Sequence, residues 1–123
     1  MMSHLVRAGL LALVCAGATS HAATARTVYD GQWSVLIVTD HGNCDRAYRY
    51  GIQIVNGVVR YNGGGANLSG RVSSGGAVRV NLSSGGSAAS GSGRLTRDGG
   101  GGTWRGHGSV GACSGNWSAE RRG

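Results

Sequence analysis

Few side chains in this sequence could take part in covalent or acid–base chemistry. The chain of 123 residues contains no lysine, which excludes a Schiff base and the lysine of a phosphate-binding P-loop. No serine lies in a Gly-x-Ser-x-Gly elbow. His41 follows Asp40 in a polar stretch typical of a turn, and His107 lies on the face opposite Trp104, where it should meet solvent. We therefore expect a protein that is not an enzyme and that holds no metal ion and no cofactor.

The cysteines predict one disulfide. Cys15 lies in an apolar leader, where the preceding Val14 is a poor match to a lipoprotein signal, so Cys44 and Cys113 remain for the folded domain. Two cysteines in an exported domain pair with each other by default. The rival interpretation, a metal site, is poor for two cysteines without a set of histidines. The bridge would close a long loop and stabilise the fold by roughly 4 kcal/mol if it acts on the unfolded chain.

The basic side chains form a second pattern. All 12 Lys and Arg positions are arginine, and residues 26–123 carry 11 of them against five carboxylates, a net charge near +6. Five arginines alternate with the apolar positions of successive segments and should face outward, namely Arg60, Arg71, Arg79, Arg94 and Arg105. They are interpreted either as a solvated face or as a site for anionic envelope components such as lipopolysaccharide, acidic polysaccharide or lipid. Nucleic acid is not expected, because no stacking aromatics interleave them.

The start of the chain predicts export. Arg7 precedes an apolar run from Ala8 to Ala18, which is too short to span a bilayer, and small residues follow. Cleavage fits after Ala22 or after Ala25. We expect residues 1–25 to be a signal peptide and residues 26–123 to be a single domain, long enough for one core. We expect this domain to be monomeric, without a membrane-spanning segment, and located in the periplasm or secreted.

Alternation of apolar and polar residues organises the rest of the chain. It predicts about eight short strands with an inward apolar face and no helix. Asn56-Gly57 is typical of a two-residue hairpin turn, and Asp98-Gly99 with three further glycines predicts another turn. Eight consecutive antiparallel strands favour an up-and-down barrel, which leaves no exposed sheet edge, over the alternative of a two-sheet sandwich.

Glycines and tryptophans share the inward positions. The 25 glycines of the chain include five at places where side chains should fill the interior, Gly70, Gly91, Gly93, Gly106 and Gly115. They would make room for Trp33, Trp104 and Trp117, or they would leave a cavity for an apolar ligand. An interior filled by the three tryptophans would exclude a ligand carrier.

Two resemblances add to this. Asp30-Gly31-Gln32-Trp33 resembles the Gly-x-Trp signature of small calycin barrels, a group that includes lipocalins, avidins and a bacterial periplasmic metalloprotease inhibitor. That resemblance implies a barrel with Trp33 closing one end. The segments Cys44-Asp45-Arg46-Ala47-Tyr48 and Cys113-Ser114-Gly115-Asn116-Trp117 resemble small secreted alphaproteobacterial proteins of unknown function, some of which are labelled haem utilisation or adhesion exoproteins.

These observations predict a non-enzymatic binding or envelope-associated protein. The first hypothesis is contact with anionic surfaces through the outward arginines. The alternative is a calycin-like carrier of a small ligand, or a periplasmic protease inhibitor with a projecting N-terminal segment. Trp33, Trp104 and Trp117 would then close the barrel or line its ligand site.

Overall fold

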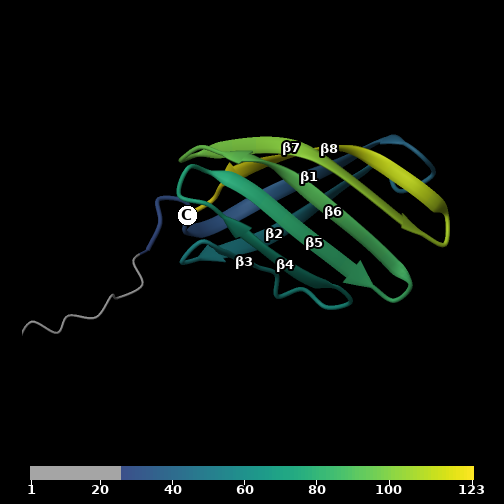
Figure 1. Ribbon diagram of the computed structural model, residues 1–123, viewed down its shortest axis with the longest axis horizontal. Helices are drawn as coiled ribbons and strands as arrows, with labels where there is room; N and C mark the ends of the chain where they lie inside the picture. Colours follow the sequence, from purple (N-terminus) through teal and green to yellow (C-terminus); the bar gives the residue numbers. More distant parts are fainter. Residues whose placement is uncertain (1–25) are drawn as a thin grey trace, which may run out of the picture.

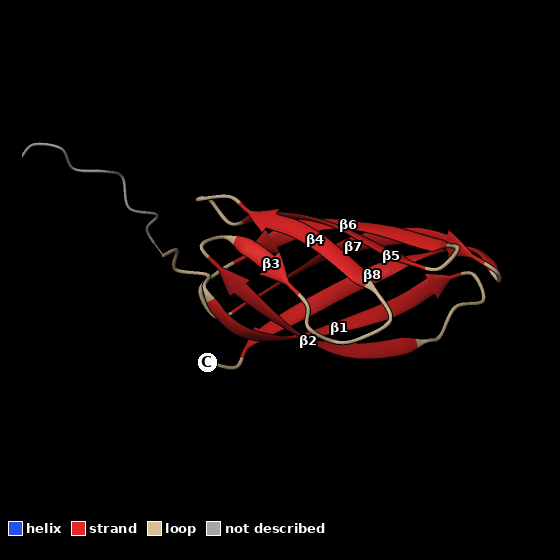
Figure 2. Cartoon of the chain, turned by 90° about the horizontal axis from the view of Figure 1, so that it is seen from below, coloured by secondary structure: helices blue, strands red, loops and turns tan. Residues whose placement is uncertain are grey.

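The computed structural model describes residues 26–123, which fold into a closed barrel of eight antiparallel strands in the order of the sequence (Figures 1 and 2). The strands are β1 (Gly31–His41), β2 (Ala47–Val55), β3 (Val58–Arg60), β4 (Asn67–Val72), β5 (Ala77–Ser84), β6 (Ser87–Leu95), β7 (Gly99–Gly108) and β8 (Gly111–Arg121). β1 closes the barrel by pairing with β8 as well as with β2. The predicted all-β class is confirmed, and the barrel is confirmed over the sandwich. The predicted signal peptide lies outside the described residues.

The predicted hairpin turn forms between β2 and β3. Asn56 and Gly57 have φ values of 52° and 79°, in the left-handed region that asparagine and glycine tolerate best.

Within residues 26–123, the structure contains no helix that is long and apolar enough to cross a membrane.

Side chains from alternate positions fill one end of the barrel. This closed end holds the start of β1 and the ends of β2 and β8. It also holds the short turn that joins β4 to β5 and the short turn that joins β6 to β7. The buried cluster there consists of Tyr29, Trp33, Ile54, Val59, Val72, Val78, Leu95, Trp117 and Ala119. Trp33 and Ile54 are its most deeply buried members, with 1% and 2% of their surface exposed. Among residues 26–123, the opposite end of the barrel carries no comparable cluster of buried side chains.

The glycine run after Asp98 is one place where the prediction was wrong. Gly99 to Gly102 belong to β7 instead of extending the turn, Gly99 pairing with β8 and Gly100 to Gly102 with both β6 and β8. A Cβ on Gly102 would lie 2.0 Å from the carbonyl oxygen of Ser92, and one on Gly100 would lie 2.6 Å from Leu95. The strand can form here because glycine lets the neighbouring backbones approach closely while Leu95 fills the interior.

The barrel wall is incomplete on one side. β3 has only three residues, three pairs join it to β2, and a single pair, Val58 with Arg71, joins it to β4. Residues 47–52 of β2 and 67–70 of β4 therefore have a strand partner on one side only. We call these two stretches, together with the glycine-rich loop 61–66 between them, the seam. Tyr61 follows β3 and lies in this loop, so the strands of the wall are shorter here than at β7 and β8 (Figure 1).

Candidate functional site

Arg121 seals the closed end from outside. Its guanidinium lies 4.8 Å from the centre of the Trp33 ring, a cation–π distance. Its Nε donates to the carbonyl oxygen of Arg97 at 2.7 Å, Nη1 donates to that of Asp30 at 2.8 Å, and Nη2 donates to that of Val28. Arg121 therefore ties the last strand, the β6–β7 turn and the N-terminal residues over the buried tryptophan.

Asp30 fixes the other side of the same end. Burial by itself raises the pKa of its carboxyl, but hydrogen bonds from the Thr27 hydroxyl and the Asn56 and Gly57 amides outweigh burial and lower it. The three bonds are 2.6, 2.7 and 3.1 Å long. The carboxylate thus joins the N-terminal segment to the β2–β3 turn. Trp33 lies buried at this end, with its Nε1 donating to the Tyr29 carbonyl at 2.8 Å.

Above this closed end the barrel encloses an apolar cavity. Its volume is about 540 Å³, within the range of small-ligand sites. Aliphatic walls come from β1, β2, β4 and β5, with the residues Val35, Ile37, Ile52, Leu68, Val80 and Leu82. Six of the seven aromatic side chains also line it, namely Trp33, Tyr48, Tyr50, Tyr61, Trp104 and Trp117. The interior is therefore not filled by the tryptophans.

The glycines divide between the two expected roles. A Cβ on Gly93 would lie 2.6 Å from the Trp117 ring, so this glycine does make room for a tryptophan. Gly91 lines the cavity instead, and the nearest atom that a Cβ there would meet belongs to the Val80 side chain, at 3.3 Å. The structure thus contains both the packed tryptophan and the open space.

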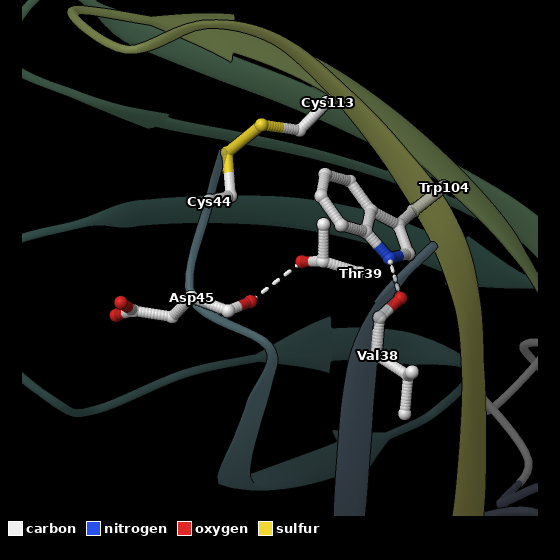
Figure 3. Close-up of a disulfide and its surroundings, with 6 residues drawn as sticks. All are labelled: Val38, Thr39, Cys44, Asp45, Trp104 and Cys113. Atoms are coloured by element: carbon white, nitrogen blue, oxygen red, sulfur yellow. Dashed lines mark hydrogen bonds between the residues drawn. A yellow bond between two sulfur atoms is a disulfide. The ribbon is translucent and has the colours of Figure 1, made fainter. Parts of the chain in front are cut away.

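The disulfide lies at the open end (Figure 3). Cys44 and Cys113 are bonded, as predicted, across a separation of 69 residues. Beside them the Thr39 hydroxyl donates to the Asp45 carbonyl at 2.6 Å and holds the β1–β2 loop against β1. Trp104 lies next to this group and donates its Nε1 proton to the Val38 carbonyl at 2.9 Å. The rim is therefore braced at the β1, β7 and β8 side.

A cluster of three tyrosines lines the cavity along the seam. Tyr48 and Tyr50 stack with ring centres 5.5 Å apart, and Tyr61 meets Tyr50 at a right angle with centres 5.7 Å apart. Asp45 is the one charged residue among those lining the cavity. Burial raises the pKa of the Tyr50 phenol, and the nearby Tyr48, Tyr61 and Asp45 raise it further. The tyrosine cluster and the carboxylate thus share one neighbourhood.

Hydrogen bonding separates the two kinds of aromatic side chain. All three indole N–H groups donate to backbone carbonyls, Trp117 to that of Ser92 at 3.1 Å. Within residues 26–123, the structure has no hydrogen bond from the hydroxyls of Tyr48, Tyr50 or Tyr61. The polar lining residues whose side chains are not engaged in a hydrogen bond within residues 26–123 are therefore the three tyrosines and Asp45, together with Asn43, Ser87 and Ser90.

The five predicted arginines lie on the outer face of the barrel and are all exposed. They span β3 to β7 and take no part in the cavity. Arg71 and Arg79 are direct cross-strand partners. The segment from residue 46 to 97 contains seven arginines and no carboxylate, so the described outer surface of β2 to β6 is uniformly basic.

The two histidines are brought together by the fold. His41 and His107, both exposed, line a shallow outer depression with Arg105 on β7 and with Ser114 on β8. In the described part of the chain, no group of three or more His, Cys, Asp or Glu residues is placed to hold a metal ion.

The sequence pattern did not predict a functional role for the tyrosines and the aspartate that line the cavity. Tyr48 and Tyr50 alternate on the inward face together with Ile52 and Ile54, and that pattern placed them inside without marking them as functional. Two tyrosines at inward positions of one strand were the available signal, because a phenol in a barrel interior needs either a partner or an opening. Asp45 had no such signal, since its position depends on the β1–β2 loop.

No family model, curated protein or solved structure matches this chain.

Proposed function

We propose that this protein is an exported, non-enzymatic barrel that binds a small apolar ligand in its interior. The observation that carries the proposal is the cavity of about 540 Å³, open at one end and lined mainly by aliphatic and aromatic side chains. Apolar walls with a few convergent polar groups are typical of a small-molecule site. The disulfide agrees with an oxidising compartment outside the cytoplasm.

The asymmetry of the barrel supports a carrier more than a protease inhibitor. Residues 27 to 30 fold against the closed end, where Thr27 and Asp30 are hydrogen-bonded. Any projecting N-terminal segment would have to come from residues outside the described part of the chain. The cavity, by contrast, is built entirely from described residues.

Tryptophan fluorescence during titration with n-alcohols of increasing length tests the proposal. Each added methylene that enters the cavity contributes about 0.8 kcal/mol, so affinity should rise about fourfold per carbon and then level off when the cavity is full. Trp33, Trp104 and Trp117 line the cavity and report on binding. Affinity that does not depend on chain length, or no binding at any length, would refute the carrier.

The variant Gly91→Leu tests the same proposal by filling part of the cavity. It places an isobutyl group in the cavity at a position whose Cβ meets no atom closer than 3.3 Å. Ser92→Leu is the control, because it puts the same group on the exposed outer face of the same strand. We expect Gly91→Leu to lower affinity by at least about tenfold and Ser92→Leu to leave it unchanged. Equal behaviour of the two variants would place binding outside the barrel.

A second candidate function rests on the outer arginines. Like charges directly opposite each other, as at Arg71 and Arg79, disfavour folding, so the pair is unfavourable unless an anion lies across it. Guanidinium groups bind phosphate and carboxylate in bidentate fashion. The candidate partner is an anionic surface of lipopolysaccharide, acidic polysaccharide or lipid.

Adsorption to anionic vesicles at rising salt tests this second function. The triple variant Arg60→Gln, Arg79→Gln and Arg105→Gln should bind about a hundredfold more weakly, at about 1 kcal/mol for each arginine near the surface. Arg122→Gln is the control, because Arg122 lies at the closed end and pairs with Glu120. Adsorption that is insensitive to salt and to the triple variant would exclude the arginine face.

A further inference from the structure

We propose that the ligand is a cationic amphiphile, with an apolar tail in the barrel and an alkylammonium head held between the tyrosine cluster and Asp45. This inference rests on the proposed function, because it names the class of ligand that the same cavity takes.

The cavity has two chemically different parts. Toward the closed end its walls are Ile54, Val59, Val72 and Leu95, all buried, and the indole N–H groups there are already bonded to the backbone. This part offers a ligand no hydrogen bond and suits an alkyl or aryl tail. Polar capacity appears only toward the open end and the seam.

At the seam the available chemistry favours a positive charge. Phenol ring faces are electron-rich and attract cations, and the Tyr50 and Tyr61 rings, which both line the cavity, lie at 90° to each other. Asp45 supplies a full negative charge on the same side, and its carboxylate points away from the disulfide and Trp104 (Figure 3). Three aromatic rings and one carboxylate make the kind of surface that recognises quaternary and other alkylammonium groups.

The seam also solves the solvation problem of a charged head. Tyr48 is 51% exposed, and the Tyr50 and Tyr61 rings are partly exposed, so a head placed there keeps contact with water. Full burial of a charge would be prohibitively costly. A tail in the cavity with the head at the seam therefore leaves no group in an unfavourable environment.

The net positive charge of the protein does not oppose this placement. The five arginines of β3 to β7 face outward, and no arginine within residues 26–123 lines the cavity. Arg49, on the same strand as the tyrosines, donates from Nη1 to the Ser34 hydroxyl at 2.9 Å on the outer face. Arg46, next to Asp45 in the sequence, is exposed and does not line the cavity, and salt screens such exposed charges, so we expect the Asp45 carboxylate to dominate at the head.

The experiment compares three probes of equal tail length, decyltrimethylammonium, decanol and decanoate, each below its micelle concentration, by calorimetric titration of the full folded domain. We expect the cation to bind about tenfold more tightly than the alcohol, and the carboxylate to bind more weakly than either. Equal binding of cation and alcohol, or tighter binding of decanoate, overturns the inference while the carrier function stands. Binding of none of the three defeats the proposed function itself.

Two variants assign the preference to its residues. Asp45→Asn should remove most of the advantage of the cation over the alcohol, because it weakens binding of the cation far more than binding of decanol. Asp40→Asn is the matched control, because that carboxylate accepts from Asn116 on the outer face and does not line the cavity. Tyr50→Phe keeps the ring face and should keep the preference, whereas Tyr50→Leu should lose it. A preference unchanged in both Asp45→Asn and Tyr50→Leu overturns the placement of the head.

Discussion

The two ends of this barrel are held together in different ways. The closed end packs side chains against one another around Trp33 and adds the Arg121 and Asp30 hydrogen bonds outside them. The open end has partly exposed walls around a cavity and is braced by a disulfide and a few hydrogen bonds to backbone carbonyls. A small barrel can therefore leave space for a ligand at one end because packing at the other end supplies most of the stability.

Truncating a tryptophan at each end gives the largest contrast. Trp33→Ala should lower the free energy of unfolding by roughly 4–5 kcal/mol, because it empties the centre of the buried cluster and unpairs Arg121. Trp104→Ala should lower it by only about 1–2 kcal/mol, because that ring is partly exposed and borders space that is already open. Chemical denaturation measures both. Losses of similar size would mean that the ends are equally packed.

The disulfide should matter nearly as much, for a different reason. Replacing Cys44 and Cys113 with serine should reduce stability by about 4 kcal/mol, since a loop of about 70 residues is no longer closed in the unfolded chain. The effect should appear mainly as faster loss of structure at the open end. Denaturation of the double variant, beside the wild-type protein with and without reductant, provides the measurement, and a change below about 1 kcal/mol would contradict it.

Two neighbouring arginines sharpen the description of the closed end. Arg121→Met should reduce stability by about 2 kcal/mol, because it leaves three carbonyl groups without their donor. Arg122→Met should cost less than about 0.5 kcal/mol, because its ion pair with Glu120 is solvent-exposed. Thermal or denaturant unfolding of the two variants should therefore separate them clearly. Similar losses would remove the anchoring role of Arg121.

Acid should weaken the closed end through Asp30. The pKa of this carboxyl is lowered in the folded state, so its stabilisation is complete above the ordinary value of 3.8 and is lost as pH falls through the folded-state pKa. Asp30→Asn should reduce stability by about 1 kcal/mol near pH 7 and by less in strong acid. Denaturation curves of wild type and variant at several pH values measure the difference. A gap between them that stays constant from neutral pH into acid would show that the ionised carboxylate is not the stabilising form.

The sequence predicted the closed end better than the open end, and the reason is physical. Alternation at Trp33, Ile54 and Trp117 marks buried strand faces, and two cysteines in a small domain leave one pairing, so both follow from local pattern. The early end of β3 and the position of Tyr61 do not, because they depend on where the loop 61–66 meets β5, at the bond from the Ser84 hydroxyl to the Gly65 carbonyl. The glycines from Gly99 onward likewise look like a turn in the sequence, because only the pairing of Gly100 to Gly102 with β6 on one side and β8 on the other makes them a strand.

The seam has a consequence for the size of molecule that can enter. A barrel of eight fully paired strands would fix the width of its opening, because a wider opening would require breaking hydrogen bonds between strands. Here one flank is spanned by the glycine-rich loop 61–66, where Tyr61 lies, and Tyr50 beside it is paired with β1 but with no strand on its other side. We therefore expect a bulky ligand to enter when the Tyr50 and Tyr61 rings and the loop 61–66 move aside, while every backbone hydrogen bond of the sheet stays in place.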